Sequence, residues 1–215
     1  MFAHYWRRRM RGHHFATRYA FYWLNPASRL ADDFAEIRQH LGLKTFGRAM
    51  DFGCHVGRLT TAIRANSTEF WGADLFSTVP APVDKYIQVK DQKPGNPNYF
   101  PDAADGTFDT IIVPELSGWK PGHEGNWSDL FSAHDARLNR FLTPGNFHRI
   151  IRPGGLMIVT ANESAIEDRV GKRTLSQINA DIDSLYPHPE IEGFTFVLKG
   201  LCPTYVAPYI VYRRD

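Results

Sequence analysis

The chain has 215 residues, of which 43% are apolar and 22% charged, a balance typical of one globular domain with a substantial core. Its formal net charge of +2 is too small to indicate a nucleic-acid partner by itself, and no run of about 18 apolar residues is present that would span a membrane. The two cysteines, Cys54 and Cys202, provide no disulfide framework, so we expect a reducing, cytoplasmic compartment.

Residues 1–27 interleave arginines with aromatic side chains, and no acidic residue precedes Asp32. Rings that stack on bases beside arginines that meet phosphates are typical of a nucleic-acid surface. A segment folded over a ligand pocket, with its rings in the core or the substrate wall, would use the same residues. We favour this second interpretation because the basic run is short. The predicted organisation is therefore a basic aromatic segment over 1–27 and a single domain over 28–215.

A helix is predicted to follow this segment, because apolar residues recur at helical intervals as far as Leu41. Ser28 is a candidate N-cap for this helix, and Gly42 is a stop signal.

The stretch 48–60 reads as a strand, a tight loop and a helix. Its apolar residues end on the carboxylate of Asp51, and the turn that follows carries Gly53 and Gly57. Glycines in such a turn let the backbone approach a ligand closely, and the helix behind it directs unpaired N–H groups at an anionic end. A dinucleotide fold requires the spacing G-x-G-x-x-G, which these glycines lack, so hydride transfer is disfavoured.

A second short strand is predicted over 69–76 and carries Asp74, roughly 20 positions after Asp51. In nucleotide-binding α/β units an acid at the end of the second strand accepts hydrogen bonds from ribose hydroxyls, which makes Asp74 the leading candidate for a binding residue. A third strand is predicted over 86–91 and ends on Asp91. That residue is either a ligand contact or a surface charge.

The remaining pattern alternates between strands and helices. A buried strand is predicted over 108–113, followed by Pro114 and Glu115. Loops beyond the carboxyl ends of strands bind ligands in open α/β sheets, so the loop 117–127 is assigned to a substrate pocket. The further predicted elements are a helix over 128–141, a turn at 152–155 into a strand that ends at 160, a helix over 174–185, and strands over 194–198 and 209–212.

Residues 51–60, Asp-Phe-Gly-Cys-His-Val-Gly-Arg-Leu-Thr, resemble the first motif of class I S-adenosylmethionine-dependent methyltransferases, with His55 at the usual middle glycine. The Arg-Pro-Gly-Gly turn at 152–155 resembles that family's entry to its fifth strand, and the resemblance spans about residues 30–161. It implies a Rossmann-like α/β fold, a mostly parallel seven-stranded sheet with helices on both faces. It also implies S-adenosyl-L-methionine as cofactor, held by Asp51, Gly53, Cys54, His55, Gly57, Asp74, Leu75, Asp91 and Pro114.

Methyl transfer from a sulfonium is an in-line displacement with a neutral leaving group, so the enzyme mainly orients donor and acceptor. An alcohol or protonated amine acceptor would need a base, for which Glu115, His123 and His134 are candidates. Adjacent His-Glu and His-Asp pairs in this region lack the spacing of a metal site, and no metal is expected.

From the sequence we expect a small-molecule acceptor with an O, N or C nucleophile. The sequence leaves the oligomeric state open. Two alternatives remain. The first is an RNA or DNA methyltransferase that uses the basic N-terminus, and the second is a catalytically silent scaffold with a methyltransferase-like fold.

Overall fold

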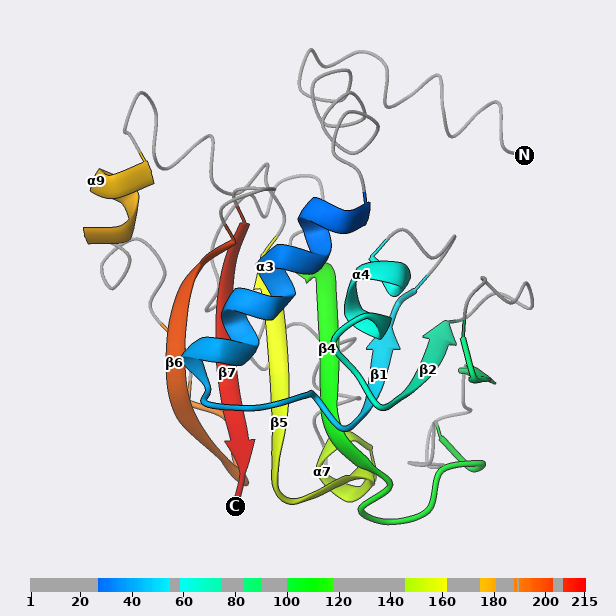
Figure 1. Cartoon of the computed structure of the whole chain (residues 1–215). Helices are drawn as coiled ribbons and strands as arrows, with labels where there is room; N and C mark the ends of the chain where they lie inside the picture. The colour runs from blue at the N-terminus through cyan, green and yellow to red at the C-terminus, as the bar shows by residue number, and fades with distance from the viewer. Residues whose placement is uncertain are drawn as a thin grey trace, which may run out of the picture.

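The computed structural model describes residues 27–54, 59–74, 83–89, 100–117, 146–161, 175–180, 188, 190–202 and 207–215. Within these residues, seven strands form one sheet in the order β3-β2-β1-β4-β5-β7-β6 (Figure 1). The strands are β1 (Arg48–Phe52), β2 (Glu69–Asp74), β3 (Lys85–Gln88), β4 (Phe108–Ser117), β5 (Ile151–Ala161), β6 (Phe194–Cys202) and β7 (Ala207–Arg214), and the helices are α3 (Ala27–His40), α4 (Thr60–Arg64), α7 (Phe147–Ile150) and α9 (Leu175–Ala180). Strands β1 to β5 pair in parallel and β7 is antiparallel to both of its neighbours, so the predicted mostly parallel sheet is confirmed.

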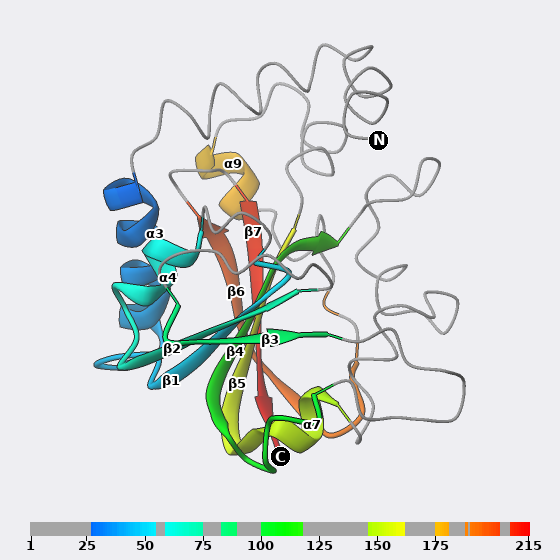
Figure 2. The same cartoon turned by 90° about the vertical axis from the view of Figure 1, so that its right-hand side faces the viewer.

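Helices cover both faces of the sheet, as predicted. Figure 2 shows α3 and α4 on one face and α7 on the other. Side chains alternate between the faces of a strand, so consecutive residues of β1 have different surroundings. Asp51 faces α4, where it meets Thr60. Phe52 faces α7, where its ring lies 4.9 Å from that of Phe147 and 5.9 Å from that of Phe100, measured between centroids. Strand β1 therefore separates a polar site from an aromatic core.

Helix α3 packs against α4 through one apolar face, in which Phe34 is fully buried. The chain leaves the helix through Gly42, whose φ of 67° is left-handed. The amides of Gly42 and Leu43 donate to carbonyls of the last helical turn at 2.9 and 3.0 Å, which is the Schellman arrangement. The predicted stop at Gly42 is confirmed. The predicted N-cap is wrong, because the helix begins at Ala27 and Ser28 lies inside its first turn.

The entry to β5 is a bulge within the strand. Phe108 of β4 pairs with Ile151, and Thr110 pairs with Leu156, so five steps along β5 oppose two along β4. The residues of β5 between these two pairs, 152–155, are the Arg-Pro-Gly-Gly stretch that the sequence predicted as a turn before the strand. The structure corrects this boundary, because β5 begins at Ile151 and accommodates the turn as an irregularity in its pairing.

Strand β4 is longer than the sequence predicted. It continues to Ser117, which pairs with Ala161, so Pro114 and Glu115 lie inside the strand. Glu115 was predicted to lie just past the fourth strand, and the structure corrects this because Glu115 lies inside β4. The pairing shifts register between Val113 and Ser117, and this interval contains the proline, which has no N–H to donate to the ladder.

The last two strands are confirmed and extended beyond their predicted ranges, to 194–202 and 207–214. Helix α9 lies within the predicted helix 174–185. The predicted N-terminal segment, apart from residue 27, the loop 117–127 beyond its first residue, and the helix 128–141 lie outside the described residues. In the described part of the chain, no helix is long and apolar enough to cross a membrane.

Candidate functional site

The site begins with Asp51 near the carboxyl end of β1. Its side chain is buried, with 1% of the residue exposed. The hydroxyl of Thr60, the first residue of α4, donates a hydrogen bond of 2.9 Å to Oδ2 of Asp51, and Oδ1 has no hydrogen-bond partner among the described residues. A buried carboxylate oxygen without a donor is unusual, because its desolvation is not repaid. The atom is therefore a candidate for contact with a ligand.

The chain turns sharply after β1. Gly53 has a φ of 85°, a left-handed conformation that side chains disfavour. The amides of Gly53 and Cys54 both donate to the carbonyl of Ala73, at 2.7 and 3.3 Å. Ala73 precedes Asp74 in β2, so these bonds attach the glycine turn directly to the end of the neighbouring strand.

Asp74 occupies that strand end and has only 8% of its surface exposed. Asp51 pairs with Gly72 in the parallel register, so Asp74 lies two residues further along β2, on the same face of the sheet as Asp51. The Asp74 carbonyl accepts a hydrogen bond of 2.8 Å from the amide of Val89, which fixes the strand end from the β3 side. Two acids and the glycine turn therefore meet at the carboxyl edge of β1 and β2.

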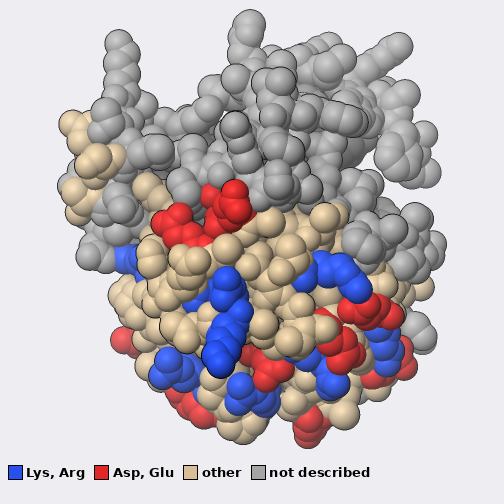
Figure 3. Space-filling model, in the orientation of Figure 1, with Lys and Arg blue, Asp and Glu red and all other residues tan. Residues whose placement is uncertain are grey.

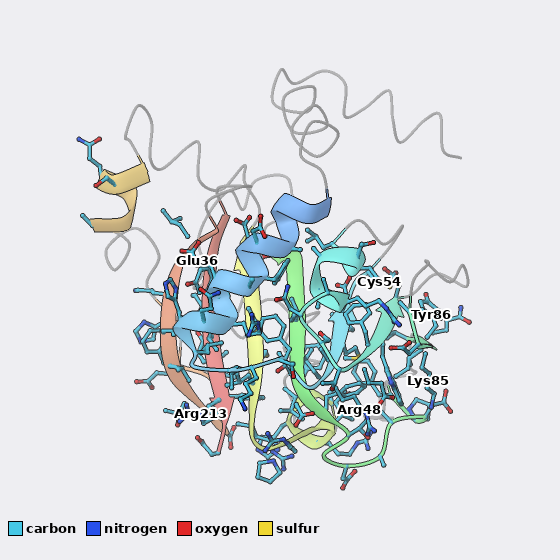
Figure 4. The ribbon with its side chains drawn as sticks, in the orientation of Figure 1. Glu36, Arg48, Cys54, Lys85, Tyr86 and Arg213 are labelled. Atoms are coloured by element: carbon cyan, nitrogen blue, oxygen red, sulfur yellow. The ribbon has the colours of Figure 1, made fainter. Side chains whose placement is uncertain are left out.

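Gly72 permits the close packing beneath this site. A Cβ atom at position 72 would lie 3.0 Å from Sγ of Cys54, 3.1 Å from Cγ1 of Val83 and 3.5 Å from Cδ2 of Tyr86. Figure 4 shows Cys54 at the carboxyl end of β1 beside α4, with Tyr86 on the β3 side. The absence of a side chain at position 72 thus lets Cys54, Val83 and Tyr86 pack closely against β2.

The electrostatics of the site favour neutral forms. Burial raises the pKa of Asp51 to about 7, against the lowering effect of the Thr60 hydrogen bond, and the charge of Asp74 raises it further. Burial, together with Asp51 and Asp74, raises the pKa of the Cys54 thiol to about 12. Burial, together with Cys54 and Asp74, raises the pKa of Tyr86 to about 12. At neutral pH the thiol and the phenol are uncharged, and Asp51 is close to its midpoint.

The structure brings together four of the predicted binding residues, Asp51, Gly53, Cys54 and Asp74. Strand β4 contains Pro114 and Glu115, whose side chains lie outside the description. The other predicted residues also lie outside the described part of the chain, namely His55, Gly57, Leu75, Asp91, His123 and His134. Among the described residues, no group of three or more His, Cys, Asp or Glu could hold a metal ion.

Three contributors to the site were not predicted. Thr60 belongs to the motif at 51–60, but the motif does not indicate its bond to Asp51. The sequence indicates Tyr86 only as part of a strand. Gly72 carried a usable signal, because a glycine inside a strand indicates a bulge or a close approach of neighbouring atoms.

Known proteins of similar structure identify the fold to which this geometry belongs. No protein-family model and no curated protein sequence matches the chain. An S-adenosylmethionine-dependent methyltransferase from Clostridium acetobutylicum ATCC 824 is similar in structure, with a TM-score of 0.52 and 13% identity over 94% of this chain and 98% of that one. The PH0226 protein from Pyrococcus horikoshii OT3 has a TM-score of 0.50 and 13% identity, over 87% and 90% of the two chains. The chain therefore has the fold of class I S-adenosylmethionine-dependent methyltransferases.

Proposed function

We propose that the chain is an S-adenosylmethionine-dependent methyltransferase that acts on a small-molecule O, N or C nucleophile. The observation that carries this proposal is the pair of hydrogen bonds from Gly53 and Cys54 to the carbonyl of Ala73. They hold the glycine turn against the strand end that bears Asp74. A ligand with a sugar at one end and an amino-acid tail at the other requires such an acid and such a turn side by side.

The residues present fit this cofactor. In this proposal Asp74, at the end of β2, accepts hydrogen bonds from the ribose hydroxyls. The left-handed Gly53 lets the backbone approach the amino-acid tail. The unpartnered Oδ1 of Asp51 supplies an acceptor beside that turn. The polar groups of the cofactor would meet all three of these features.

The cofactor, when bound, supplies an activated methyl group, so the chain has to orient it and exclude water. Buried groups dominate this part of the site: Asp51, Cys54 and Asp74 all have less than a tenth of their surface exposed. If the acceptor requires a base, Glu115 remains our candidate because β4 carries it toward the carboxyl edge of the sheet. His123 and His134 remain candidates on the sequence alone.

The mixed charge of the face seen in Figure 3 supports a small-molecule acceptor. Figure 3 shows Lys and Arg interspersed with Asp and Glu on the viewed face. Several arginines are paired, with Nε of Arg48 2.7 Å from Glu69 and Nη2 of Arg64 2.7 Å from Asp84. A nucleic-acid surface would instead concentrate one sign of charge along a groove or stripe. The free, buried thiol of Cys54 supports a reducing compartment, which we take to be the cytoplasm.

Titration calorimetry with S-adenosylhomocysteine tests the proposal. We expect the wild-type chain to bind it, and Asp74→Asn to weaken binding by roughly 10- to 100-fold through loss of a charged hydrogen-bond acceptor. Asp102→Asn is the matched control, because Asp102 is exposed and precedes β4 at the amino-terminal ends of the strands. An absence of heat with wild type at millimolar ligand would refute the proposal.

The nature of the acceptor needs its own measurement. Incubation with labelled S-adenosylmethionine and a panel of small alcohols, amines and carbon acids should transfer the label to one of these classes. An oligonucleotide that binds with a steep salt dependence and accepts the label would overturn the small-molecule assignment. Binding of S-adenosylhomocysteine without transfer to any acceptor would point instead to a silent scaffold.

A further inference from the structure

The side-chain carboxyl group of Asp51 is buried and accepts a hydrogen bond at one of its two oxygens. The residue is 1% exposed, Thr60 donates to Oδ2, and Oδ1 has no hydrogen-bond partner in the part of the chain that the structure describes. A carboxylate in such a place is normally neutralised by a cation. In the part of the chain that the structure describes, no lysine or arginine is paired with Asp51.

The neighbours of Asp51 also disfavour its negative charge. Strand β2 places a second carboxylate, Asp74, close enough to act on it. The turn contributes the Cys54 thiol, and β4 contributes the apolar Ile112, which is its partner in the register. Among the described residues, only the hydroxyl of Thr60 on α4 favours ionisation of Asp51. Asp51 and Asp74 are two buried acids in one site, and Asp51 is there more stable with a proton.

We propose that below about pH 7 Asp51 carries a proton in the free protein and releases it when the ammonium group of the methyl donor binds, so that cofactor binding in this pH range is coupled to proton release. This inference rests on the proposed function and adds a pH control to it. The orphaned Oδ1 is the atom that the ammonium group would contact. A cation brought to that atom supplies the charge that the described surroundings lack.

The coupled step balances in atoms and charge. The O–H bond of Asp51 breaks, its electron pair stays on the carboxylate, and the proton passes to water and then to the buffer. The ligand keeps its ammonium group and gains a buried ionic partner. Burial and Asp74 hold the pKa of Asp51 near 7 in the free protein. Ligand binding should therefore release close to one proton per ligand about one pH unit below 7 and no proton well above 7. Affinity should therefore rise with pH up to about 7 and then level off.

Calorimetry in paired buffers measures the proton directly. Binding of S-adenosylhomocysteine at about pH 6 should release close to one proton per ligand, seen as a difference in heat between two buffers of unequal ionisation enthalpy. Adenosine has no ammonium group and is the matched ligand control, which should bind without release. Asp51→Asn should abolish the release, and Asp74→Asn should reduce it by favouring ionisation of Asp51 in the free protein.

Two further measurements guard against variants that fail to fold. The side-chain carboxyl carbon of Asp51, followed by NMR in the free wild-type protein, should titrate near pH 7. Thr60→Val removes the only hydrogen bond that a described residue donates to the carboxylate, and it should move this midpoint upward by roughly one unit. Equal heats of S-adenosylhomocysteine binding in both buffers, or equal release with adenosine, would overturn the coupling and leave the proposed function standing. No binding of S-adenosylhomocysteine at all would overturn both.

Discussion

Thr60 donates a hydrogen bond of 2.9 Å to one oxygen of Asp51, while no described residue donates one to the other oxygen of the same buried carboxylate. The bond joins the start of α4 to the end of β1 across the glycine turn, so it fixes the position of the acid. Burial raises the pKa of this carboxyl group to about 7, although the hydrogen bond from Thr60 lowers it. A site built to meet a cation is thus destabilising in the free protein at neutral and higher pH.

Asp51→Asn should make the stability of the free protein less dependent on pH. The pKa of Asp51 is about 7 in the folded chain and about 3.8 in the unfolded one, so between these values the folded chain retains a proton that the unfolded chain has lost. Wild-type stability therefore falls as pH rises from about 4 to 7, by up to about 4 kcal/mol, and stays low above 7. Asparagine cannot ionise, so the variant should match wild type at pH 4 and exceed it at pH 8.

Urea unfolding of wild type and Asp51→Asn across this pH range checks the prediction. Asp102→Asn provides the control for loss of one exposed carboxylate and should track the wild-type curve. Parallel curves for wild type and Asp51→Asn would show that the buried acid is ionised throughout, contrary to its surroundings.

Gly53→Ala should damage binding as well as stability. The left-handed φ of 85° at this position would strain an alanine by about 1–2 kcal/mol, and relief of the strain would move the two amides that bond to Ala73. Gly42→Ala is a matched control, because Gly42 has a φ of 67° and open space where the added Cβ atom would lie. Both variants should lower the free energy of unfolding similarly, but calorimetry should show weakened S-adenosylhomocysteine binding only for Gly53→Ala. Equal affinities in the two variants would contradict this.

The strands along the chain and the two central acids could be predicted from the sequence because their signals are local. Asp51 and Asp74 each follow a buried apolar run, and Gly53 follows the first acid closely. Parallel strands place such ends at the same edge, so proximity follows from the fold class. The hydrogen bonds from Gly53 and Cys54 to the carbonyl of Ala73 hold these strand ends together.

Other features depend on contacts between distant segments and have no local signal. The fourth strand was predicted to end at Val113, where its apolar run ends, yet pairing with β5 extends the strand to Ser117 through a register shift. The bond from Thr60 depends on how α4 is placed over β1. Periodicity predicts the helix but not the rotation that aims one hydroxyl at a carboxylate.

Gly72→Ala should be destabilising, and removal of the Cys54 sulfur should partly relieve it. The new Cβ atom would lie 3.0 Å from Sγ of Cys54 and 3.1 Å from Val83, so overpacking should reduce the free energy of unfolding by about 1–3 kcal/mol. Cys54→Ala alone leaves a small cavity. In the double variant the cavity receives the added methyl group, so the combined loss should be smaller than the two single losses added together. Thermal unfolding of the four proteins measures this coupling, and strict additivity would argue against contact through this pair.

Asn66→Ala should weaken the attachment of α3 to α4. The Asn66 amide donates to the carbonyls of Ala31 and Ala62 at 3.0 and 3.1 Å and accepts from Nε of Arg38 at 3.2 Å. Because Asn66 is 8% exposed, the abandoned groups would be poorly solvated, and we expect a loss of about 2–3 kcal/mol in the free energy of unfolding. Ser67→Ala, which removes one hydrogen bond of 2.9 Å, should lose only about 0.5–1 kcal/mol. Urea denaturation compares them, and a similar loss in both would mean that Asn66 is an ordinary surface contact and not the link between the two helices.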